Sequence, residues 1–277
     1  MMTVIFGVLV GLALGLTGGG GSIFAVPLLI YGLNVPPRDA VAISLIAVAV
    51  TAAFGAVEGA LRRVLEWRAA AIFAAAGVAF APAGVWLGDL VPSGVTVVAF
   101  AGLMLIVAVR MILKSYRLPE QARVIRARVA NDAAADAATV CRYSTDGRLR
   151  LTARCSFALL GAGVLVGVLS GFFGVGGGFL IVPALIMVTE MGIHRAVSTS
   201  LLVIALVGVS GVISAVVAGR HIEPVLTSLF ILGGILGMGA GRVLARYLAG
   251  RTLQFVFAAG MIVIGTMMLV ERLGLFS

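Results

Sequence analysis

The sequence has very little charge. Its 277 residues include 20 Lys+Arg and 11 Asp+Glu, so charged residues make up 11% of the chain and hydrophobic residues 61%. The mean hydropathy is +1.19. A soluble globular domain carries about 25% charged residues. This composition excludes a water-soluble fold.

Cysteine and histidine are nearly absent, with two residues of each type. Cys141 and Cys155 have no histidine near them, so they do not form a zinc site. They flank an Arg-rich segment that we expect in the cytosol, where thiols stay reduced, and a structural disulfide is therefore not expected. The glycine run 18–22 lacks the lysine of a phosphate-binding loop. No cofactor and no metal is expected.

The net charge of +9 lies in the segments between apolar runs. Basic residues in such loops report membrane topology, so they do not indicate a nucleic-acid partner. Eight uncharged runs approach or exceed the roughly 20 residues that cross a hydrocarbon core. They are 1–37, 40–57, 69–88, 90–109, 155–189, 196–219, 224–241 and 252–270. The sequence predicts an all-α polytopic membrane protein with about eight hydrophobic segments, because transmembrane β-strands are shorter and alternate in polarity.

The second half of the chain repeats the first at an offset of 156 residues. Over positions 7–45, 17 of 39 aligned pairs are identical, and the alignment needs no gap. We therefore expect a first membrane repeat over 1–113, a basic cytoplasmic loop over 114–156 with a short amphipathic helix near 121–129, and a second membrane repeat over 157–277.

Each repeat opens with a long apolar run that glycines interrupt, at 18–21 and at 174–178. The runs are too long for one straight crossing, and pieces of roughly 16 residues are short for two. We interpret them as broken, re-entrant helical hairpins, whose turns must be covered by protein or line a watery cavity. Each half then has one hairpin and three transmembrane helices, an odd number of crossings that inverts the second repeat.

The positive-inside rule favours the inverted arrangement of the two repeats. With inverted repeats, 17 of the 20 Lys+Arg lie on the same side as the 114–156 loop, and with parallel repeats only 15 do.

The second arms of the two hairpins begin near Ser22 and Gly178. Their free N–H groups and partial positive charge would converge near mid-membrane and form an anion site without a buried Lys or Arg. Ser22 is expected to cap its arm. The substrate-binding candidates are Gly20, Gly21, Ser22, Ser44, Gly176, Gly177, Gly178, Thr199 and Ser200.

The hydroxyls of Ser44 and Ser200, which are repeat equivalents, are expected to donate to the anion. The alternative is a hydrogen bond to a carbonyl of their own helix. Glu58 is expected to form an ion pair with Arg62 one turn later, and Asp89 is expected at the membrane interface.

Four further sets of glycines fit helix packing through small residues. These sets are Gly7, Gly11 and Gly15; Gly163, Gly167 and Gly171; Gly84 and Gly88; and Gly233, Gly237 and Gly241. The faces of small residues would also allow two copies of the chain to pack together as a homodimer.

The pattern G-x-x-G-x-G-G-x-x-x-x-x-P occurs at Gly15–Pro27 and again at Gly171–Pro183, and Ser-Thr-Ser-Leu stands at 198–201. With the duplicated halves and the basic central loop, these motifs resemble the TauE/SafE sulfite-exporter family of membrane permeases. The resemblance implies a plasma-membrane permease for a small sulfur-containing or organic anion, such as sulfite, sulfoacetate or another sulfonate. Rocking of the halves around the hairpin tips would give alternating access, with the anion and the lipid bilayer as partners.

Other functions remain open at this point. A non-transporting scaffold subunit would use the glycines only for packing, and a small-anion channel would have a continuous pore. The string Gly208-Val209-Ser210-Gly211 resembles that of intramembrane serine proteases, but the two histidines, His194 and His221, lie in predicted loops. We therefore expect no enzyme activity. The exact substrate, the direction of transport and the coupling ion are not determined by the sequence.

Overall fold

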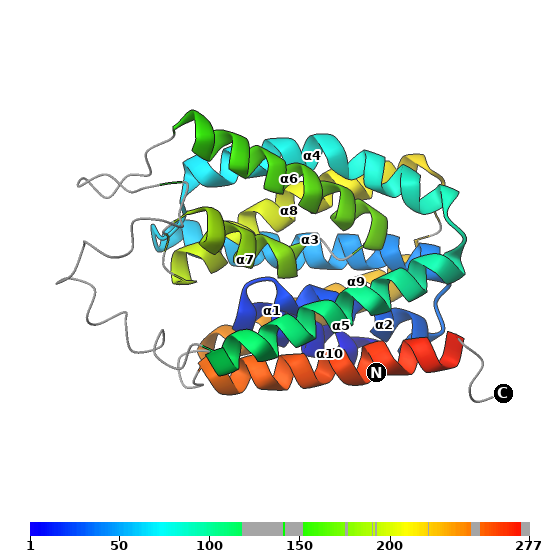
Figure 1. Cartoon of the computed structure of the whole chain (residues 1–277). Helices are drawn as coiled ribbons and strands as arrows, with labels where there is room; N and C mark the ends of the chain where they lie inside the picture. The colour runs from blue at the N-terminus through cyan, green and yellow to red at the C-terminus, as the bar shows by residue number, and fades with distance from the viewer. Residues whose placement is uncertain are drawn as a thin grey trace.

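The computed structural model describes residues 1–117, 141, 152–174, 177–189, 191, 193–220, 222–244 and 250–272. These residues are nearly all helical, and the axes of the long helices are roughly aligned, so that the helices form a bundle (Figure 1). The elements are α1 (Met2–Thr17), η1 (Gly20–Phe24), α2 (Ala25–Pro27), η2 (Leu28–Gly32), α3 (Pro37–Leu61), α4 (Trp67–Leu90), α5 (Ser93–Arg117), α6 (Ala153–Phe173), α7 (Gly178–Val188), α8 (Ile193–Val217), α9 (Pro224–Leu244) and α10 (Gly250–Arg272). The helix expected near 121–129 lies outside the described residues.

Five helices in the described part of the chain are long and apolar enough to cross a membrane, namely α3, α4, α6, α8 and α9. Shorter apolar stretches occur in α1, in Gly20–Gly32, in α5 and in α10. The prediction of an all-α polytopic membrane protein is confirmed, whereas the count of eight segments stays a prediction. The expected arm length of about 16 residues is wrong for α6, which has 21 residues, because the uncharged run before Gly174 is itself 19 residues long and the helix begins two residues ahead of it.

Both predicted breaks occur at the glycines. Gly18 ends α1 with φ 73°, and Gly174 ends α6 with φ 70°, which is the left-handed conformation that glycine adopts without steric cost. The Gly18 amide donates to the Leu14 carbonyl (2.7 Å), and the Gly174 amide donates to the Ser170 carbonyl (2.9 Å). The two breaks are 156 residues apart, and so are both ends of α3 and α8.

The two halves of the chain are intertwined. Helix α1 packs on α9, α4 on α6, α3 on α8 and α5 on α10, so each of these pairs joins one element from each half (Figure 1). Backbone carbonyls of the neighbouring helix lie against Gly7, Gly11 and Gly15 of α1, and others lie against Gly163, Gly167 and Gly171 of α6. The predicted small-residue packing is therefore confirmed at these sites, and also at Gly84, Gly88, Gly233, Gly237 and Gly241.

The interior and the outer surface are both apolar. One large cluster of buried side chains includes Leu14, Phe73, Ile181 and Phe230, and so draws on both halves. Large hydrophobic side chains also cover the outside, among them Phe157, which is 74% exposed. Such a surface is what lipid contact requires.

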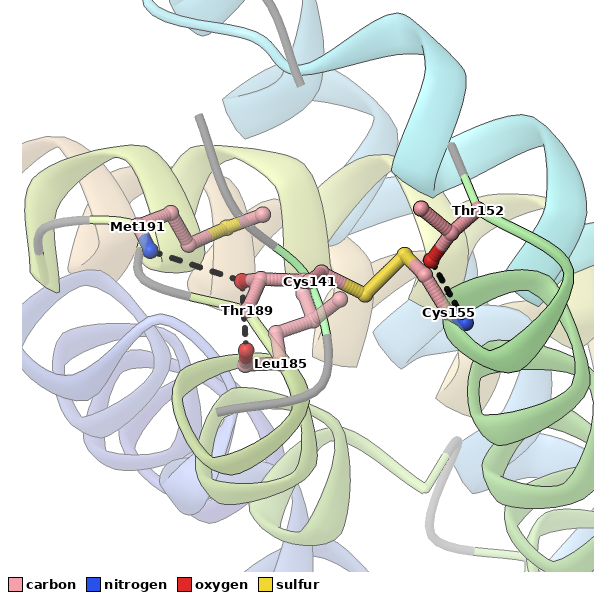
Figure 2. The surroundings of a disulfide bond; sticks show 6 residues. All are labelled: Cys141, Thr152, Cys155, Leu185, Thr189 and Met191. Atoms are coloured by element: carbon pink, nitrogen blue, oxygen red, sulfur yellow. Dashed lines mark hydrogen bonds between the residues drawn. A yellow bond between two sulfur atoms is a disulfide. The ribbon is translucent and has the colours of Figure 1, made fainter. Parts of the chain in front are cut away.

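Cys141 and Cys155 form a disulfide, so the expectation that they would stay unbonded is wrong (Figure 2). The Cys141 amide donates to the Val188 carbonyl (3.0 Å), which anchors Cys141 at the end of α7. Cys155 lies in the first turn of α6, and the two Cα atoms are 5.0 Å apart, within disulfide range. The expectation rested on the compartment alone. Both cysteines are fully buried, which shields the bond from reductants.

We predict that Gly167→Ala destabilises the protein whereas Gly161→Ala in the same helix does not. A Cβ at residue 167 would clash with the Gly77 backbone of α4, while residue 161 has open space around it. Overpacking costs about 1–3 kcal/mol, and alanine is favoured over glycine in an exposed helix by about 1 kcal/mol. Thermal unfolding in detergent should give a lower Tm for Gly167→Ala only. Equal Tm values for both variants would contradict the close packing of α4 on α6.

Candidate functional site

The two glycine turns meet in the buried interior. A Cβ on Gly178 would clash with the backbone of Gly19, and a Cβ on Gly19 would clash with Gly178. The tips of the two hairpins therefore touch through their backbones. The sequence analysis read Gly178 as a position of close approach, and the partner that approaches it is the other hairpin.

Ser44 and Ser200 each form a hydrogen bond to the glycine turn of the other half of the chain. The Ser44 hydroxyl of α3 donates to the Gly174 carbonyl of the second hairpin. The Ser200 hydroxyl of α8 donates to the Gly18 carbonyl of the first hairpin (2.6 Å). Each hydroxyl also has a carbonyl of its own helix within range, Val41 at 3.1 Å and Val197 at 2.8 Å. Since a serine carries one hydroxyl proton, both protons already have an acceptor among the backbone carbonyls.

Ser22 does not cap its arm, which corrects that expectation. Its hydroxyl donates to the Gly19 carbonyl (2.7 Å), and no side-chain cap bond forms at the start of η1. The hydroxyl instead bonds a backbone carbonyl three residues earlier in the chain, as serine side chains do in turns. Gly21 packs against the backbone of α1, and Gly177 packs against Val166 of α6, so both tips fold back on their first arms.

Thr199 lies apart from the tips. Its hydroxyl accepts a hydrogen bond from the Glu66 amide (3.1 Å), ahead of α4. The other predicted site residues that the structure describes, including Gly20, are at the turns or on the helices that hold them. Gly176 lies outside the described residues.

The N-terminus of α7 is next to an unpartnered hydroxyl. The amides of Leu180 and Ile181 donate to the Gly177 carbonyl (2.9 and 3.1 Å), so helix geometry leaves the N–H groups of residues 178 and 179 without a helical acceptor. The Ser170 hydroxyl is buried without a hydrogen-bond partner, and its Cβ lies 3.4 Å from where a Cβ of Gly177 would be. Such an orphan is uncommon in a folded interior.

Sequence reasoning missed Ser170, although a signal was present. Its repeat equivalent at the same offset is Leu14, so the second repeat has a hydroxyl where the first has an apolar side chain. In the described residues, the uncharged polar residues that are buried are serines and threonines: Ser22, Ser44, Thr51, Ser170, Thr189, Ser198, Thr199, Ser200 and Thr227. Near the tips, hydroxyl and amide groups are therefore the donors that the interior can offer to an anion.

Ion pairs connect the halves at both ends of α3. Glu58 near the end of α3 pairs with Arg62 (2.8 Å), as predicted, and also with Arg242 of α9. At the start of α3, the Arg220 guanidinium donates to the Arg38 carbonyl (3.2 Å) and pairs with Asp89 of α4 (2.9 Å). Each end of the bundle thus has an ionic contact between the first and second repeat.

The Gly208–Gly211 string packs helices together. The Ser210 hydroxyl donates to the Val78 carbonyl of α4 (2.7 Å), and Gly208 lies against Ala49 of α3. This agrees with the packing role expected from the sequence.

The chain matches the family model "Sulfite exporter TauE/SafE" over residues 3–268. It is 37% identical over 267 residues to a "Probable membrane transporter protein" of Xylella fastidiosa (strain Temecula1), covering 95% of this chain and 92% of that protein. It is 24% identical over 285 residues to the "Probable membrane transporter protein YunE" of Bacillus subtilis (strain 168), covering 100% of this chain and 99% of the relative. No solved structure matches the chain.

We predict that Ser44→Ala and Ser200→Ala each destabilise the protein. Removing either hydroxyl leaves a buried carbonyl of a glycine turn with one partner fewer, which costs about 1–3 kcal/mol. Ser228→Ala is the matched control, because that exposed hydroxyl only bonds the Val225 carbonyl of its own helix. Tm in detergent should fall for both turn variants and not for the control. Unchanged Tm values would show that the serines do not hold the turns.

Proposed function

Because the chain belongs to the TauE/SafE sulfite exporter family, we propose that this multi-pass membrane transporter moves a small sulfur-containing or organic anion, such as sulfite, sulfoacetate or another sulfonate. We further propose that it works by alternating access and performs no catalysis. The plasma membrane is the expected location for such a transporter. The observation that carries the substrate class is the unpartnered, buried Ser170 hydroxyl beside the α7 N-terminus.

An anion in this position would need hydrogen-bond donors of the protein around it and no hydrogen-bond acceptors. The proposed donors are the Ser170 hydroxyl and the backbone N–H groups at the tips, near Gly20 and Gly21 on one hairpin and Gly177 and Gly178 on the other. Helix N-termini favour negative charge through their free N–H groups and their dipole. A site without a buried Lys or Arg binds the anion weakly enough to release it, as a transporter requires. In this proposal Ser44 and Ser200 position the tips.

Two features support inverted repeats and alternating access. Helices α3 and α8 have equivalent bounds in the two repeats and run antiparallel where they pack, since Gly208 lies against Ala49 while Gly59 lies against Ser198. The ion pairs at the two ends of α3 connect the halves on opposite sides of the tips. Rocking one half against the other would open one end while the other pair stays closed.

We predict that Ser170→Ala raises the KM for anion flux about tenfold or more without lowering Tm. A hydrogen bond to a charged group contributes about 1.5–3 kcal/mol, and 1.4 kcal/mol corresponds to a factor of ten. Loss of an unpartnered buried hydroxyl should leave stability unchanged or raise it. Flux of labelled sulfite, sulfoacetate and taurine into proteoliposomes measures KM for the wild type, for Ser170→Ala and for the Ser228→Ala control.

Saturable flux of at least one of these sulfur compounds is the expected wild-type result. The absence of such flux would overturn the substrate class. An unchanged KM in Ser170→Ala would remove this hydroxyl from the site, and flux that rises linearly with concentration would favour a channel.

We predict that Ser22→Cys reacts with a membrane-impermeant maleimide from either side of the membrane. Ser22 is fully buried between the tips, so the thiol becomes accessible only when one end opens. The chain has two native cysteines and they are bonded to each other, so the introduced thiol is the free one. Right-side-out and inside-out vesicles provide the two sides. Reaction from the same single side under all conditions, with and without substrate, would contradict alternating access.

A further inference from the structure

A pocket opens at the end of the bundle where α3 and α5 begin and α4 and α6 end. Its polar lining groups are Arg38, Arg220 and Thr96, and the rest of the lining is apolar. The cavity volume is about 30 Å³, which is more than one water molecule requires. None of the lining residues, all of which lie in the described part of the chain, is acidic.

Arg220 is the buried cation of this pocket. Its side chain is only 6% exposed, although it comes from the segment between α8 and α9. One terminal nitrogen donates to Asp89 Oδ1 (2.9 Å) and, more weakly, to the Val85 carbonyl (3.4 Å), while the other donates to the Arg38 carbonyl (3.2 Å). The Nε–H is buried and has no partner. These bonds fix both terminal nitrogens of the guanidinium in place.

Arg38 adds a second, exposed cation at the rim. Its Nη2 donates to the Asp89 backbone carbonyl (3.2 Å), so the side chain is drawn toward the segment that holds Arg220. Both arginines therefore line the same pocket, and both contact Asp89: Arg38 contacts its backbone carbonyl and Arg220 its carboxylate. The Asp89 carboxylate pairs with Arg220 and is not part of the lining.

The inner wall of the pocket is aromatic and leads toward the glycine turns. Phe173 stacks edge-on against Phe172, with ring centroids 4.7 Å apart, and lies 5.4 Å from Phe100. Phe173 directly precedes Gly174, and Val41, another lining residue, contacts Gly174. The pocket thus extends from the Arg38 rim to the residues that flank one hairpin tip.

We propose that this mouth pocket is a separate binding subsite for a small anion with a short apolar body, such as a one- or two-carbon sulfonate or carboxylate. The anionic group would bind the Arg38 guanidinium beside the positive charge of Arg220, and the apolar body would lie against Phe100 and Phe173. Binding of an anion in the pocket does not depend on the proposed function. A role for the pocket in supplying anions to the site at the tips does rest on the proposed function.

The test measures binding directly, with purified protein in detergent and no flux. Tm is titrated with sodium methanesulfonate against sodium chloride at equal ionic strength, and with dimethyl sulfone as the neutral isostere. We expect a saturable rise in Tm with methanesulfonate only. The apparent Kd should increase at least fivefold in Arg38→Gln, which removes the exposed cation of the rim. The same increase is expected in Arg220→Lys, which keeps the charge next to Asp89 and removes the guanidinium that lines the pocket.

Two controls separate this pocket from other sites. Arg68→Gln removes an exposed arginine at the other end of α4, about 30 Å along the helix from Gly88 of the pocket. Arg68→Gln should keep the wild-type Kd for methanesulfonate. Ser170→Ala weakens binding at the proposed site at the tips, so the titration is repeated in that background, where the shift that depends on Arg38 and Arg220 should remain.

Three results would overturn the proposal. The first is a wild-type protein whose Tm shows no saturable rise with methanesulfonate. The second is an equal rise in Tm with dimethyl sulfone. The third is that Arg38→Gln and Arg220→Lys bind methanesulfonate as well as Arg68→Gln does. Loss of the whole saturable shift in Ser170→Ala, with Arg38→Gln and Arg220→Lys unchanged, would move the binding to the tips and overturn the proposal as well. Failure of sulfur-anion flux would overturn the proposed function while leaving this binding assay interpretable.

Discussion

The structure depends on satisfying the backbone groups that two broken helices expose inside an apolar interior. Helices α1 and α6 stop at Gly18 and Gly174, and their turns are buried, where water cannot complete the hydrogen bonds. Serine hydroxyls from the opposite half complete them, since Ser200 donates to Gly18 and Ser44 to Gly174. Neither half could bury its own turn in this way without the other.

The intertwined packing follows from that exchange. For α3 and α8 to reach the turns of the other half, the hairpin arms must lie on helices of the other half, as α1 does on α9 and α6 on α4. Glycines at every fourth position allow these backbones to approach each other closely, which replaces the hydrophobic driving force that lipid does not supply. The ionic contacts at Glu58 and Asp89 then connect the halves at the two ends of the bundle.

The two proposed anion sites differ in their chemistry. At the tips, the donors are neutral: helix N–H groups and the Ser170 hydroxyl. At the mouth, Arg220 and Arg38 supply full charge beside an aromatic wall. In these proposals, charge at the mouth would attract an anion from water, while neutral donors at the tips would bind it less strongly than a cation there would. Such a gradient of binding strength suits a molecule that must leave again.

The sequence by itself determined the membrane class, the duplication and the two helix breaks, because apolar run length, a repeat offset and left-handed glycines are local properties of the chain. It also identified Ser44 and Ser200 as a pair, and Glu58 with Arg62, since repeat equivalence and one-turn spacing are visible along the chain. Only the tertiary structure decided their partners. The carbonyls that accept from the serines are 130 and 182 residues away. Residue 141 lies at the end of α7, where it forms the disulfide with Cys155. The Ser170 hydroxyl and the Arg220 Nε are buried without a hydrogen-bond partner. Such contacts depend on which segments meet in three dimensions, and neither composition nor spacing along the chain contains that information.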